Sequence, residues 1–461
     1  MSEIVVIGAG FAGLYSALLL ARRGHSVLIL EQDPATPPED TEACFSGWPR
    51  RGVAQARQPH LLLNRTARVL QDQTPDVLAA FVSQGANLLT AAGERVGPEE
   101  RERLFLTCGR RLPLEAILRR LVLAEPGVEL QSGVLVSGLV LRDRTVRGVR
   151  LDDGSEVPAE LVLDCAGRWS RSREWLSAAG VGLDPERRQD CDFVYLTMWR
   201  RRRAHDYPPG GVPRRAVSPF GNFLCYPADG TVFGATMTLS MQDPLKGKCR
   251  DPQAFARVFG AIAAFDGWLE GSEAISEPEV TARIENCWRT LLDDGRPAVG
   301  GLLLVGDSAM HTNPTLGRGI GLAFLQAARL PQLLERHPAG SPELLAALEA
   351  WRTQELGPWY LTQADADARR LAQLREALAG EDAVEPADER GRFAAAVAIA
   401  AAEDPYVAEQ SMRMFHMLAT PGEVAADPRV QQAVDKVFER GSSLVPSHSG
   451  PARAEFEAAL G

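Results

Sequence analysis

Three glycines near the start of the chain have a spacing that lets a polypeptide backbone bind phosphate. Gly8, Gly10 and Gly13 directly follow the apolar run of residues 4–7, which is typical of a buried parallel strand. Gly8 permits a tight turn, Gly10 lets the backbone approach a pyrophosphate, and Gly13 lets a helix lie close to the strand. The motif therefore predicts a dinucleotide site, although FAD and NAD share the ADP half that it would bind.

The residues that follow complete a strand–helix–strand unit around these glycines. A helix is expected from Phe11 to about residue 23, and a second strand over residues 27–30 ends in Glu31. The Glu31 carboxylate is placed to accept hydrogen bonds from a ribose and would repel a 2′-phosphate. A flexible loop could match the glycines by chance, but this context favours dinucleotide binding, with further contacts from Phe11, Ala12 and Gln32.

Basic and amide side chains occur where two other segments would pass the same site. Arg51 and Gln55 lie in a Pro/Gly-rich loop that must approach the cofactor if Glu31 binds its ribose, but a solvated surface loop is equally consistent. Arg111 stands at the start of a helix expected to reach about residue 124, where it could pair with phosphate or form a surface basic pair. A further helix is expected over residues 59–70, and His60 in it is interpreted as structural.

Two later strands end in acidic residues followed by glycines. Asp164 ends the apolar run 161–163, and Gly167 follows in a turn. Gly306 and Asp307 follow the apolar run 302–305 in the same way. Ligands of open α/β sheets bind at the carboxyl ends of the strands, so both ends are candidate site positions.

A glycine-rich segment after the second of these strands opens another helix, expected over residues 320–335. Consecutive backbone amides at such a helix start favour an anion or a developing negative charge. The segment contains Pro314, Gly317, Arg318, Gly319 and Ile320.

The middle of the chain changes character at about residue 185. Residues 193–199, 222–226 and 232–239 are β-branched and aromatic and are separated by Gly/Pro turns, which is typical of antiparallel sheet. Tyr195, Thr197 and Trp199 share one face of a strand, and Tyr226 is a candidate neighbour. These four residues are substrate-site candidates, although each taken singly is better explained as a core residue. A helix is expected over residues 253–269.

Composition excludes several classes of function. The 461 residues carry a formal net charge of −10, which argues against nucleic acid as the main partner. Seven cysteines have no metal-binding spacing, so no metal site is expected and reduced thiols in the cytoplasm are the default interpretation. The glycine motif leaves no room for a signal peptide, and no apolar run reaches ~18 residues, so no membrane span is expected.

Together, three motifs resemble those of flavoprotein monooxygenases with the para-hydroxybenzoate hydroxylase fold. They are the Gly8–Gly13 motif with Glu31, the segment from Asp164 to Arg173, and the segment from Gly306 to Pro314 with Gly317 and Gly319. The likeness covers about residues 4–334, and the most similar subgroup is that of bacterial oxidoreductases resembling squalene and polyene epoxidases.

The resemblance implies tightly held FAD and a role for each motif. Residues 8–13, Glu31, Arg51 and Arg111 would bind the ADP and pyrophosphate portion, Val136 would lie near the adenine and Asp307 would bind the ribityl chain. The amides of residues 317–320 would face the flavin pyrimidine. Two positions depart from the family pattern: Met310 stands where His is frequent, and Arg318 stands where Gln is frequent. The added charge of Arg318 could help stabilise an anionic reduced flavin.

The fold class implied is α/β, with a Rossmann-like FAD-binding domain, an inserted antiparallel substrate domain and a helical C-terminal region. The expected divisions are 1–184 with 286–340, 185–285, and 341–461.

The implied activity is insertion of one oxygen atom from O₂, through a flavin C4a-hydroperoxide, into an apolar or aromatic small molecule by epoxidation or hydroxylation. The flavin carries this chemistry, so no catalytic side chain is assigned. NAD(P)H or a separate flavin reductase would supply electrons. Alternatives are a reductase similar to geranylgeranyl reductase, a non-catalytic FAD-binding protein, and a flavin halogenase. The halogenase is disfavoured because that family carries an essential lysine in its N-terminal half, whereas Lys246 is the first lysine here.

Overall fold

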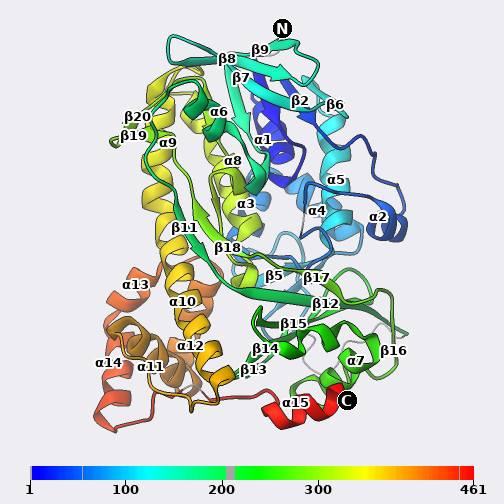
Figure 1. Ribbon diagram of the computed structural model, residues 1–461, viewed down its shortest axis with the longest axis vertical. Coiled ribbons are helices and arrows are strands. Elements are labelled where there is room, and N and C mark those ends of the chain that lie inside the picture. Colours follow the sequence, from blue (N-terminus) through cyan, green and yellow to red (C-terminus); the bar gives the residue numbers. More distant parts are fainter. Residues whose placement is uncertain (1–2, 54, 204–212, 446) are drawn as a thin grey trace.

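A five-stranded parallel sheet lies at the centre of the upper part of the molecule in Figure 1. The computed structural model describes residues 3–53, 55–203, 213–445 and 447–461. The strand order is β21-β10-β1-β2-β6. The strands are β1 (Ile4–Ile7), β2 (Val27–Glu31), β6 (Val128–Ser132), β10 (Leu161–Asp164) and β21 (Leu302–Leu304). All four residues of β1 are buried, as the continuous apolar run predicted.

Three helices pack beside this sheet. They are α1 (Phe11–Ala21), α5 (Arg111–Leu123) and α8 (Gly319–Leu334), with α1 between the other two. Helix α1 ends slightly before the predicted position and is buried along almost its whole length. It packs against α8, with the rings of Tyr15 and Phe324 4.3 Å apart between their centroids. This packing brings the N-termini of α1 and α8, far apart in sequence, to one region of the molecule.

Smaller elements extend this upper part. An antiparallel sheet contains β7 (Val136–Arg142), β8 (Thr145–Leu151) and β9 (Glu156–Pro158), and another contains β3 (Leu61–Leu62), β5 (Phe105–Cys108) and β4 (Asn87–Thr90). The helices are α2 (Thr41–Gly47), α3 (Asn64–Gln73), α4 (Pro75–Ser83) and α6 (Ser172–Ala178). The helix predicted over residues 59–70 was therefore wrong at its start, because Leu61 and Leu62 pair with β5, a partner distant in sequence.

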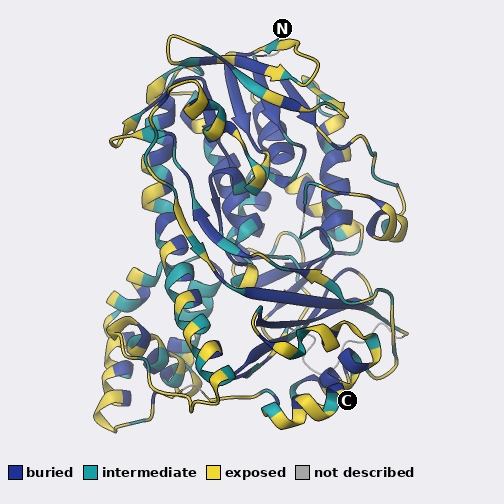
Figure 2. Cartoon of the chain, in the orientation of Figure 1, coloured by how far each residue is buried: buried dark blue, intermediate teal, exposed yellow. Residues whose placement is uncertain are grey.

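A six-stranded antiparallel sheet forms the lower right part of Figure 1. Its strands are β12 (Phe193–Arg202), β13 (Arg214–Ser218), β14 (Gly221–Pro227), β15 (Val232–Ser240), β16 (Ser272–Ala274) and β17 (Glu279–Thr281). One face packs through Val194, Leu196 and Met198 into an apolar core shared with α7 (Pro252–Gly260) and the last helix, α15 (Arg453–Leu460). Most of β12 is buried (Figure 2). The helix predicted over residues 253–269 stops at Gly260, where the chain turns so that Ile262 and Phe265 reach this core.

Helices link the two parts and fill the remaining corner. Helix α10 runs from the upper part to the lower part (Figure 1), and β11, β18 and β22 form a three-stranded sheet. Their bounds are β11 (Arg187–Asp190), β18 (Glu285–Trp288), β22 (Met310–His311), α9 (Pro342–Glu355) and α10 (Gly357–Ala379). Helices α11 (Glu389–Glu403), α12 (Pro405–Phe415), α13 (Pro421–Ala426) and α14 (Pro428–Glu439) share a small apolar core of their own.

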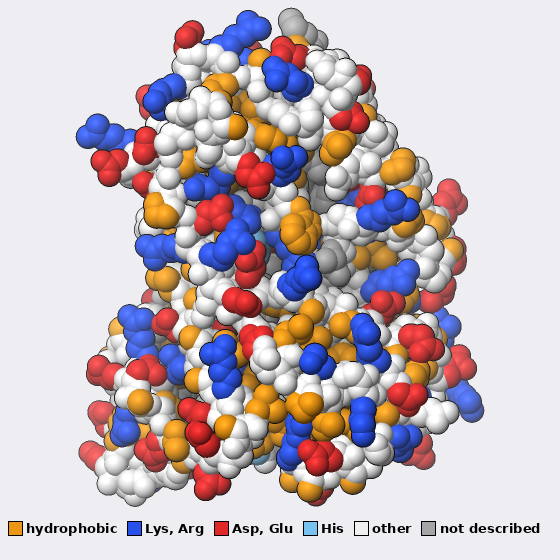
Figure 3. Space-filling model, in the orientation of Figure 1, with side chains coloured by type: hydrophobic (Ala, Val, Ile, Leu, Met, Phe, Trp, Pro, Cys, Tyr) orange, Lys and Arg blue, Asp and Glu red, His pale blue; other side chains and the backbone are white. Residues whose placement is uncertain are grey.

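Charges of both signs are mixed on the face of the molecule that Figure 3 displays. None of the helices in the described ranges is both long and apolar enough to cross a membrane.

Candidate functional site

The three N-terminal glycines are each required by a different feature of the turn between β1 and α1. Gly8 has φ +97°, and a Cβ there would lie 2.8 Å from the carbonyl oxygen of Cys165. A Cβ on Gly13 would lie only 2.0 Å from the carbonyl oxygen of Gly8. A Cβ on Gly10, in contrast, would have no described atom within 4 Å. Gly8 and Gly13 therefore shape the turn, while Gly10 borders open space.

The amides that follow Gly10 have no hydrogen-bond acceptor among the described residues, so they are available to an anion. The first hydrogen bond inside α1 is donated by the Leu14 amide to the Gly10 carbonyl, so the amides of Phe11, Ala12 and Gly13 precede the helical ladder. Such amides carry partial positive charge and favour a phosphate group.

Glu31 lies beside this turn within a cluster of buried charges. Its Oε2 accepts a hydrogen bond from the Ala9 amide at 2.8 Å, and its Oε1 accepts one from the Asp33 amide at 2.9 Å. Arg50, which is also buried, lies 3.1 Å from Glu31 and pairs with Asp33 and Glu115. The carboxylate is thus held in place by the backbone and by Arg50.

The sequence prediction selected Arg51, whereas Arg50 is the arginine inside the charge cluster. Arg51 is exposed and Gln55 is half-buried in the same loop. Gln32 is exposed, and its Nε2 would lie 3.0 Å from a Cβ on Gly52. Ala54, between these residues, lies outside the described ranges.

Arg111 is buried at the start of α5 rather than being part of a surface pair. Its guanidinium lies over the ring of Phe11, 5.0 Å from the centroid, and pairs with Glu115 at 3.0 Å. The preceding Arg110 is also buried and binds Asp229 and Glu42. Arg111 therefore stands next to the glycine turn, while Arg110 joins α5 to the lower sheet.

A cavity of about 270 Å³ separates the loop of residues 48–58 from β17. Arg50, Arg51, Gln58 and Leu112 line it from the upper part, and Val280 and Thr281 line it from the antiparallel sheet. The cavity thus lies between the glycine-turn side of the molecule and the sheet predicted to bind substrate.

Asp164, in the second motif, holds its own turn together. It is 1% exposed and accepts hydrogen bonds from the hydroxyls of Ser170 and Ser172 and from the Ala166 amide. Burial raises the pKa of Asp164, and these hydrogen bonds oppose that shift. Gly167 follows with φ +73°. The described donors to the Asp164 carboxylate all lie within its own motif, whereas its backbone carbonyl accepts hydrogen bonds from the Val305 amide and the Ser308 hydroxyl of the third strand end. Val136 lies buried at the start of β7.

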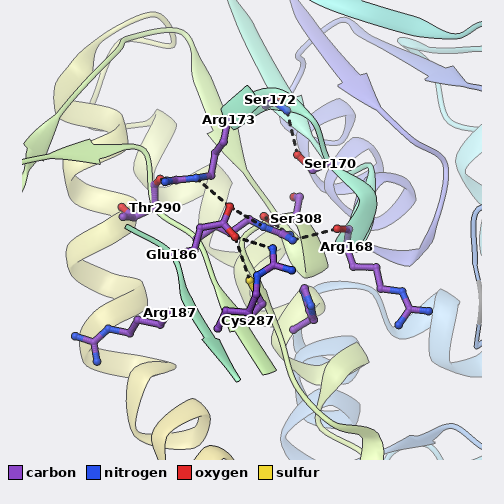
Figure 4. Close-up of polar contacts among 12 residues, drawn as sticks. Arg168, Ser170, Ser172, Arg173, Glu186, Arg187, Cys287, Thr290 and Ser308 are labelled. Atoms are coloured by element: carbon purple, nitrogen blue, oxygen red, sulfur yellow. Dashed lines mark hydrogen bonds and ion pairs between the residues drawn. The ribbon is translucent and has the colours of Figure 1, made fainter. Parts of the chain in front are cut away.

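Arg289 joins the second motif to the third. It directly follows β18, is 5% exposed, and donates to the carbonyl oxygen of Arg168 at 3.1 Å and to those of Asp307 and Ser308 at 3.4 Å each. Glu186 lies 3.3 Å from Arg289 and 3.2 Å from Arg173. Figure 4 shows Glu186 at the centre of these contacts, between Arg173 and Cys287.

The third motif packs directly against the first. Gly306 has φ +71°, and a Cβ there would lie 2.6 Å from the Cβ of Ala12. Asp307 follows at half exposure, and within the described part of the chain no hydrogen bond reaches its carboxylate. A free carboxylate next to the glycine turn is suited to binding hydroxyl groups.

The start of α8 is likewise open. Pro314 is exposed, Gly317 has φ +65°, and a Cβ on Gly319 would have no described atom within 4 Å. The first hydrogen bond inside α8 is donated by Leu322 to Arg318, so the amides of Gly319 and the buried Ile320 precede the helical ladder.

Arg318 points away from solvent. It is 3% exposed, its Nη1 donates to the carbonyl oxygen of Trp359 at 3.1 Å, and its guanidinium lies over the Trp359 ring at 5.1 Å. Burial lowers the pKa of Arg318 to about 10, so it remains charged at neutral pH.

Tyr195, Thr197 and Trp199 lie on the sheet face opposite the apolar core, as their alternation predicted. Each reaches the upper part of the molecule: Tyr195 donates to Asn313, Thr197 to Gln58, and Trp199 to the Arg57 carbonyl. Tyr226 is fully buried, with its ring edge against Trp199. All four are at most 7% exposed, so in this conformation they connect the sheet to the flanking loops.

The family comparison agrees with this arrangement. The model of the FAD dependent oxidoreductase family matches residues 3–119, the segment that contains the glycine turn, Glu31 and Arg111. In this segment the chain is similar to the FAD-dependent oxidoreductases.

Sequence relatives cover much more of the chain. A protein of Mycobacterium tuberculosis, Rv3254, is 27% identical, covering 93% of this chain and 92% of its own. The 6-methylpretetramide 4-monooxygenase of Streptomyces rimosus is 28% identical, covering 77% of this chain and 81% of its own.

Solved structures support the fold of the oxidoreductase. A mutant of 2-methyl-3-hydroxypyridine-5-carboxylic acid oxygenase superposes with a TM-score of 0.60 at 18% identity, covering 81% of this chain and 93% of its own. The flavin-dependent brominase Bmp2 superposes with a TM-score of 0.62 at 13% identity, covering 95% and 99%. The predicted fold class, a mixed α/β flavoprotein with an antiparallel sheet and a helical C-terminal region, is confirmed.

The residues present fit FAD. Two helix N-termini with free amides, the open space beside Gly10 and Gly319, and the free Asp307 carboxylate supply donors for phosphate and an acceptor for hydroxyls.

Two buried arginines of this site were missed from sequence. Arg50 and Arg289 have no motif of their own, and their neighbours in sequence give no sign of which arginine is buried.

Proposed function

We propose that this oxidoreductase is an FAD-dependent monooxygenase that inserts one oxygen atom from O₂ into an apolar or aromatic small molecule. The observation that carries the proposal is the convergence of three distant motifs, with Gly306 against Ala12 and with Arg289 joining Arg168 to Asp307. Monooxygenases among the relatives that span about three quarters of the chain support the same activity.

The glycine turn, Asp307 and the start of α8 would hold FAD by complementary chemistry. The amides of Phe11, Ala12 and Gly13 would bind the pyrophosphate, with Arg111 as the nearby cation. Asp307 would accept hydrogen bonds from the ribityl hydroxyls. The amides of Gly319 and Ile320 would face the pyrimidine edge and favour negative charge there.

Bound FAD would supply the redox and oxygen chemistry, and the protein would supply a dry, shaped site. The cavity lined by Gln58, Leu112, Val280 and Thr281 and the buried face of β12 would exclude water from the reacting groups. Electrons would come from NAD(P)H or from a separate flavin reductase.

A halogenase role is disfavoured by where the lysines lie. Lys246 and Lys248 are in the short helical segment of residues 244–250 near α7 and α15, bonded to the Asp243 carbonyl and to Gly461. Lys436 is in α14. None of these three lysines belongs to the glycine turn, to the Asp307 segment or to the start of α8.

Isotope labelling tests the proposal and its rivals together. The purified protein is expected to contain FAD and, when supplied with NADPH or photoreduced flavin, a candidate alkene or phenol and ¹⁸O₂, to form a product with one ¹⁸O atom. Reduced product without ¹⁸O would indicate a reductase, and bromide-dependent product would indicate a halogenase. Absence of bound FAD would contradict the proposal outright.

A further inference from the structure

A buried carboxylate in the C-terminal region is bonded to the loop that opens α8. Asp367, in α10, is 3% exposed. Its Oδ1 accepts hydrogen bonds from Asn313 Nδ2 at 2.8 Å and Gln363 Nε2 at 3.0 Å, and its Oδ2 accepts one from Asn286 Nδ2 at 2.8 Å. Among the described residues no arginine, lysine or histidine forms an ion pair with it. The Cys191 thiol adds a weak fourth contact, with its Sγ 3.9 Å from Oδ2. The carboxylate is therefore satisfied by neutral donors.

These contacts fix which way the Asn313 amide points. Three amide nitrogens donate to the two carboxylate oxygens, so Asp367 acts as an acceptor and the nitrogen of the Asn313 side chain faces it. The Asn313 backbone amide also donates to Asn286 Oδ1 at 2.7 Å, which holds the residue in place. The side-chain oxygen of Asn313 is consequently directed toward Tyr195.

The Tyr195 hydroxyl is the next member of this chain of hydrogen bonds. This hydroxyl lies 2.5 Å from Asn313 Oδ1 and 2.7 Å from Thr315 Oγ1. Its single proton is committed to Asn313, because an amide oxygen can only accept. Thr315 must therefore donate its own proton to Tyr195, and only lone pairs of Thr315 Oγ1 remain available to any other group.

Thr315 is the exposed end of this chain of hydrogen bonds. Tyr195 and Asn313 are buried, whereas Thr315 is exposed, between Pro314 and the glycine-rich start of α8. It also touches the sheet face predicted to bind substrate.

We propose that Asp367 fixes Thr315 as a hydrogen-bond acceptor, and that the substrate carries an O–H or N–H group, such as that of a phenol, which donates to Thr315 Oγ1. The inference rests on the proposed function, since it places the substrate beside the exposed Thr315 at the start of α8, next to the predicted flavin site. Thr315 contacts the ligand, while Asp367 is a positioning residue that acts through Asn313 and Tyr195.

Equilibrium binding to the oxidised, FAD-loaded protein tests this without turnover. The probes are 1-naphthol and its methyl ether, 1-methoxynaphthalene, which lacks the donor, and binding is followed by the change in flavin absorbance. One hydrogen bond corresponds to a preference of about two- to twelvefold for the naphthol.

Variants separate contact from positioning. Thr315→Val should abolish the preference, so that the two probes bind with about equal affinity. Asp367→Leu should do the same without touching the ligand, because it removes the acceptor that holds the Asn313 amide; that amide can then flip and leave the Tyr195 proton free to be donated to Thr315. Asp365→Asn is the matched control. The Asp365 carboxylate lies in the same helix but pairs with Arg390, outside this chain of hydrogen bonds. The variant should therefore retain the preference.

Each outcome decides the inference. Equal binding of both probes by the FAD-loaded wild type, or a retained preference in Asp367→Leu, overturns it. If Asp367→Leu does not fold, Tyr195→Phe takes its place: it frees the Thr315 hydroxyl to donate, so a retained preference there overturns the inference too. A protein that takes up no FAD contradicts the proposed function instead, which keeps the two failures distinct.

Discussion

The guanidinium of Arg318 lies over the indole ring of Trp359, 5.1 Å from its centroid, and donates to the carbonyl oxygen of the same residue at 3.1 Å. Arg318 stands at the start of α8 and Trp359 in α10, so the pair joins the predicted flavin-binding loop to the C-terminal helices. The sequence had suggested an arginine that acts on the flavin by its charge, and the structure adds this structural attachment.

Arg318→Gln is expected to destabilise the protein by about 1–3 kcal/mol, because it removes a buried cation–π contact and a charge-assisted hydrogen bond. It should also lower the flavin reduction potential by tens of millivolts, since ~30 mV corresponds to ~1.4 kcal/mol for two electrons. Urea unfolding and a redox titration measure the two effects. Arg318→Lys is the control, which should keep the flavin reduction potential but lower the stability. An unchanged reduction potential in Arg318→Gln would contradict an electrostatic effect of Arg318 on the flavin.

Gly306→Ala is expected to weaken FAD binding and stability together. The added Cβ would meet the Ala12 Cβ at 2.6 Å, and φ +71° is strained for alanine. Gly154→Ala is a matched control, because Gly154 has φ +86° but open space around its Cβ. Adding Ala12→Gly to Gly306→Ala should restore part of the FAD occupancy, measured by absorbance after gel filtration; no recovery would mean that this contact is not the cause.

Gly10→Asp is expected to abolish FAD binding while the protein stays folded. A side chain at Gly10 would meet no described atom within 4 Å, but its negative charge would face the predicted pyrophosphate. FAD titration should show a loss of at least about a hundredfold, equivalent to ~2.7 kcal/mol. The melting temperature of the FAD-free protein should stay the same. Gly13→Asp differs, because its Cβ would collide with the backbone 2.0 Å away and disturb the turn itself. Tight FAD binding by Gly10→Asp would refute the placement of the phosphate.

Arg50→Gln is expected to destabilise the protein by about 3–5 kcal/mol, because it leaves Glu31, Asp33 and Glu115 buried without their shared cation. The adjacent Arg51→Gln removes the same charge from an exposed side chain and should cost less than about 0.5 kcal/mol. Chemical unfolding of both variants gives the comparison. Equal costs would show that the cluster does not depend on Arg50.

His416 should make the protein less stable in mild acid. It is 1% exposed, and its Nδ1 accepts a hydrogen bond from the Asn64 amide at 3.2 Å, which requires the neutral ring. Burial lowers the pKa of His416 from 6.5 to about 4. Its contribution is therefore complete above pH 6.5 and is lost at about 1.4 kcal/mol per pH unit as the pH falls toward 4.

The variant His416→Asn isolates this contribution, because its side-chain oxygen can accept the same hydrogen bond without titrating. Urea midpoints between pH 4.5 and 7.5 should fall less steeply for the variant than for the wild type. Parallel curves would assign the acid sensitivity to other groups.

The sequence by itself determined the features that depend on local physics. The apolar run of residues 4–7 could only be a buried strand, and Gly8 and Gly13 were required by a turn whose geometry is set within a few residues. The alternation of Tyr195, Thr197 and Trp199 placed them on one face, because successive side chains of a strand point to opposite sides.

Tertiary structure decided which polar side chains pair with one another. Nothing local distinguishes Arg50 from Arg51, since burial is set by Glu115, 65 residues away on α5. Leu61 and Leu62 form a strand only because β5 lies beside them. Asp367 has no motif, and its importance comes from Asn286 and Asn313 reaching it from other elements. A hydrogen bond or ion pair in the interior depends on the position of both partners, and only the packed fold brings residues from distant segments within 3 Å of one another.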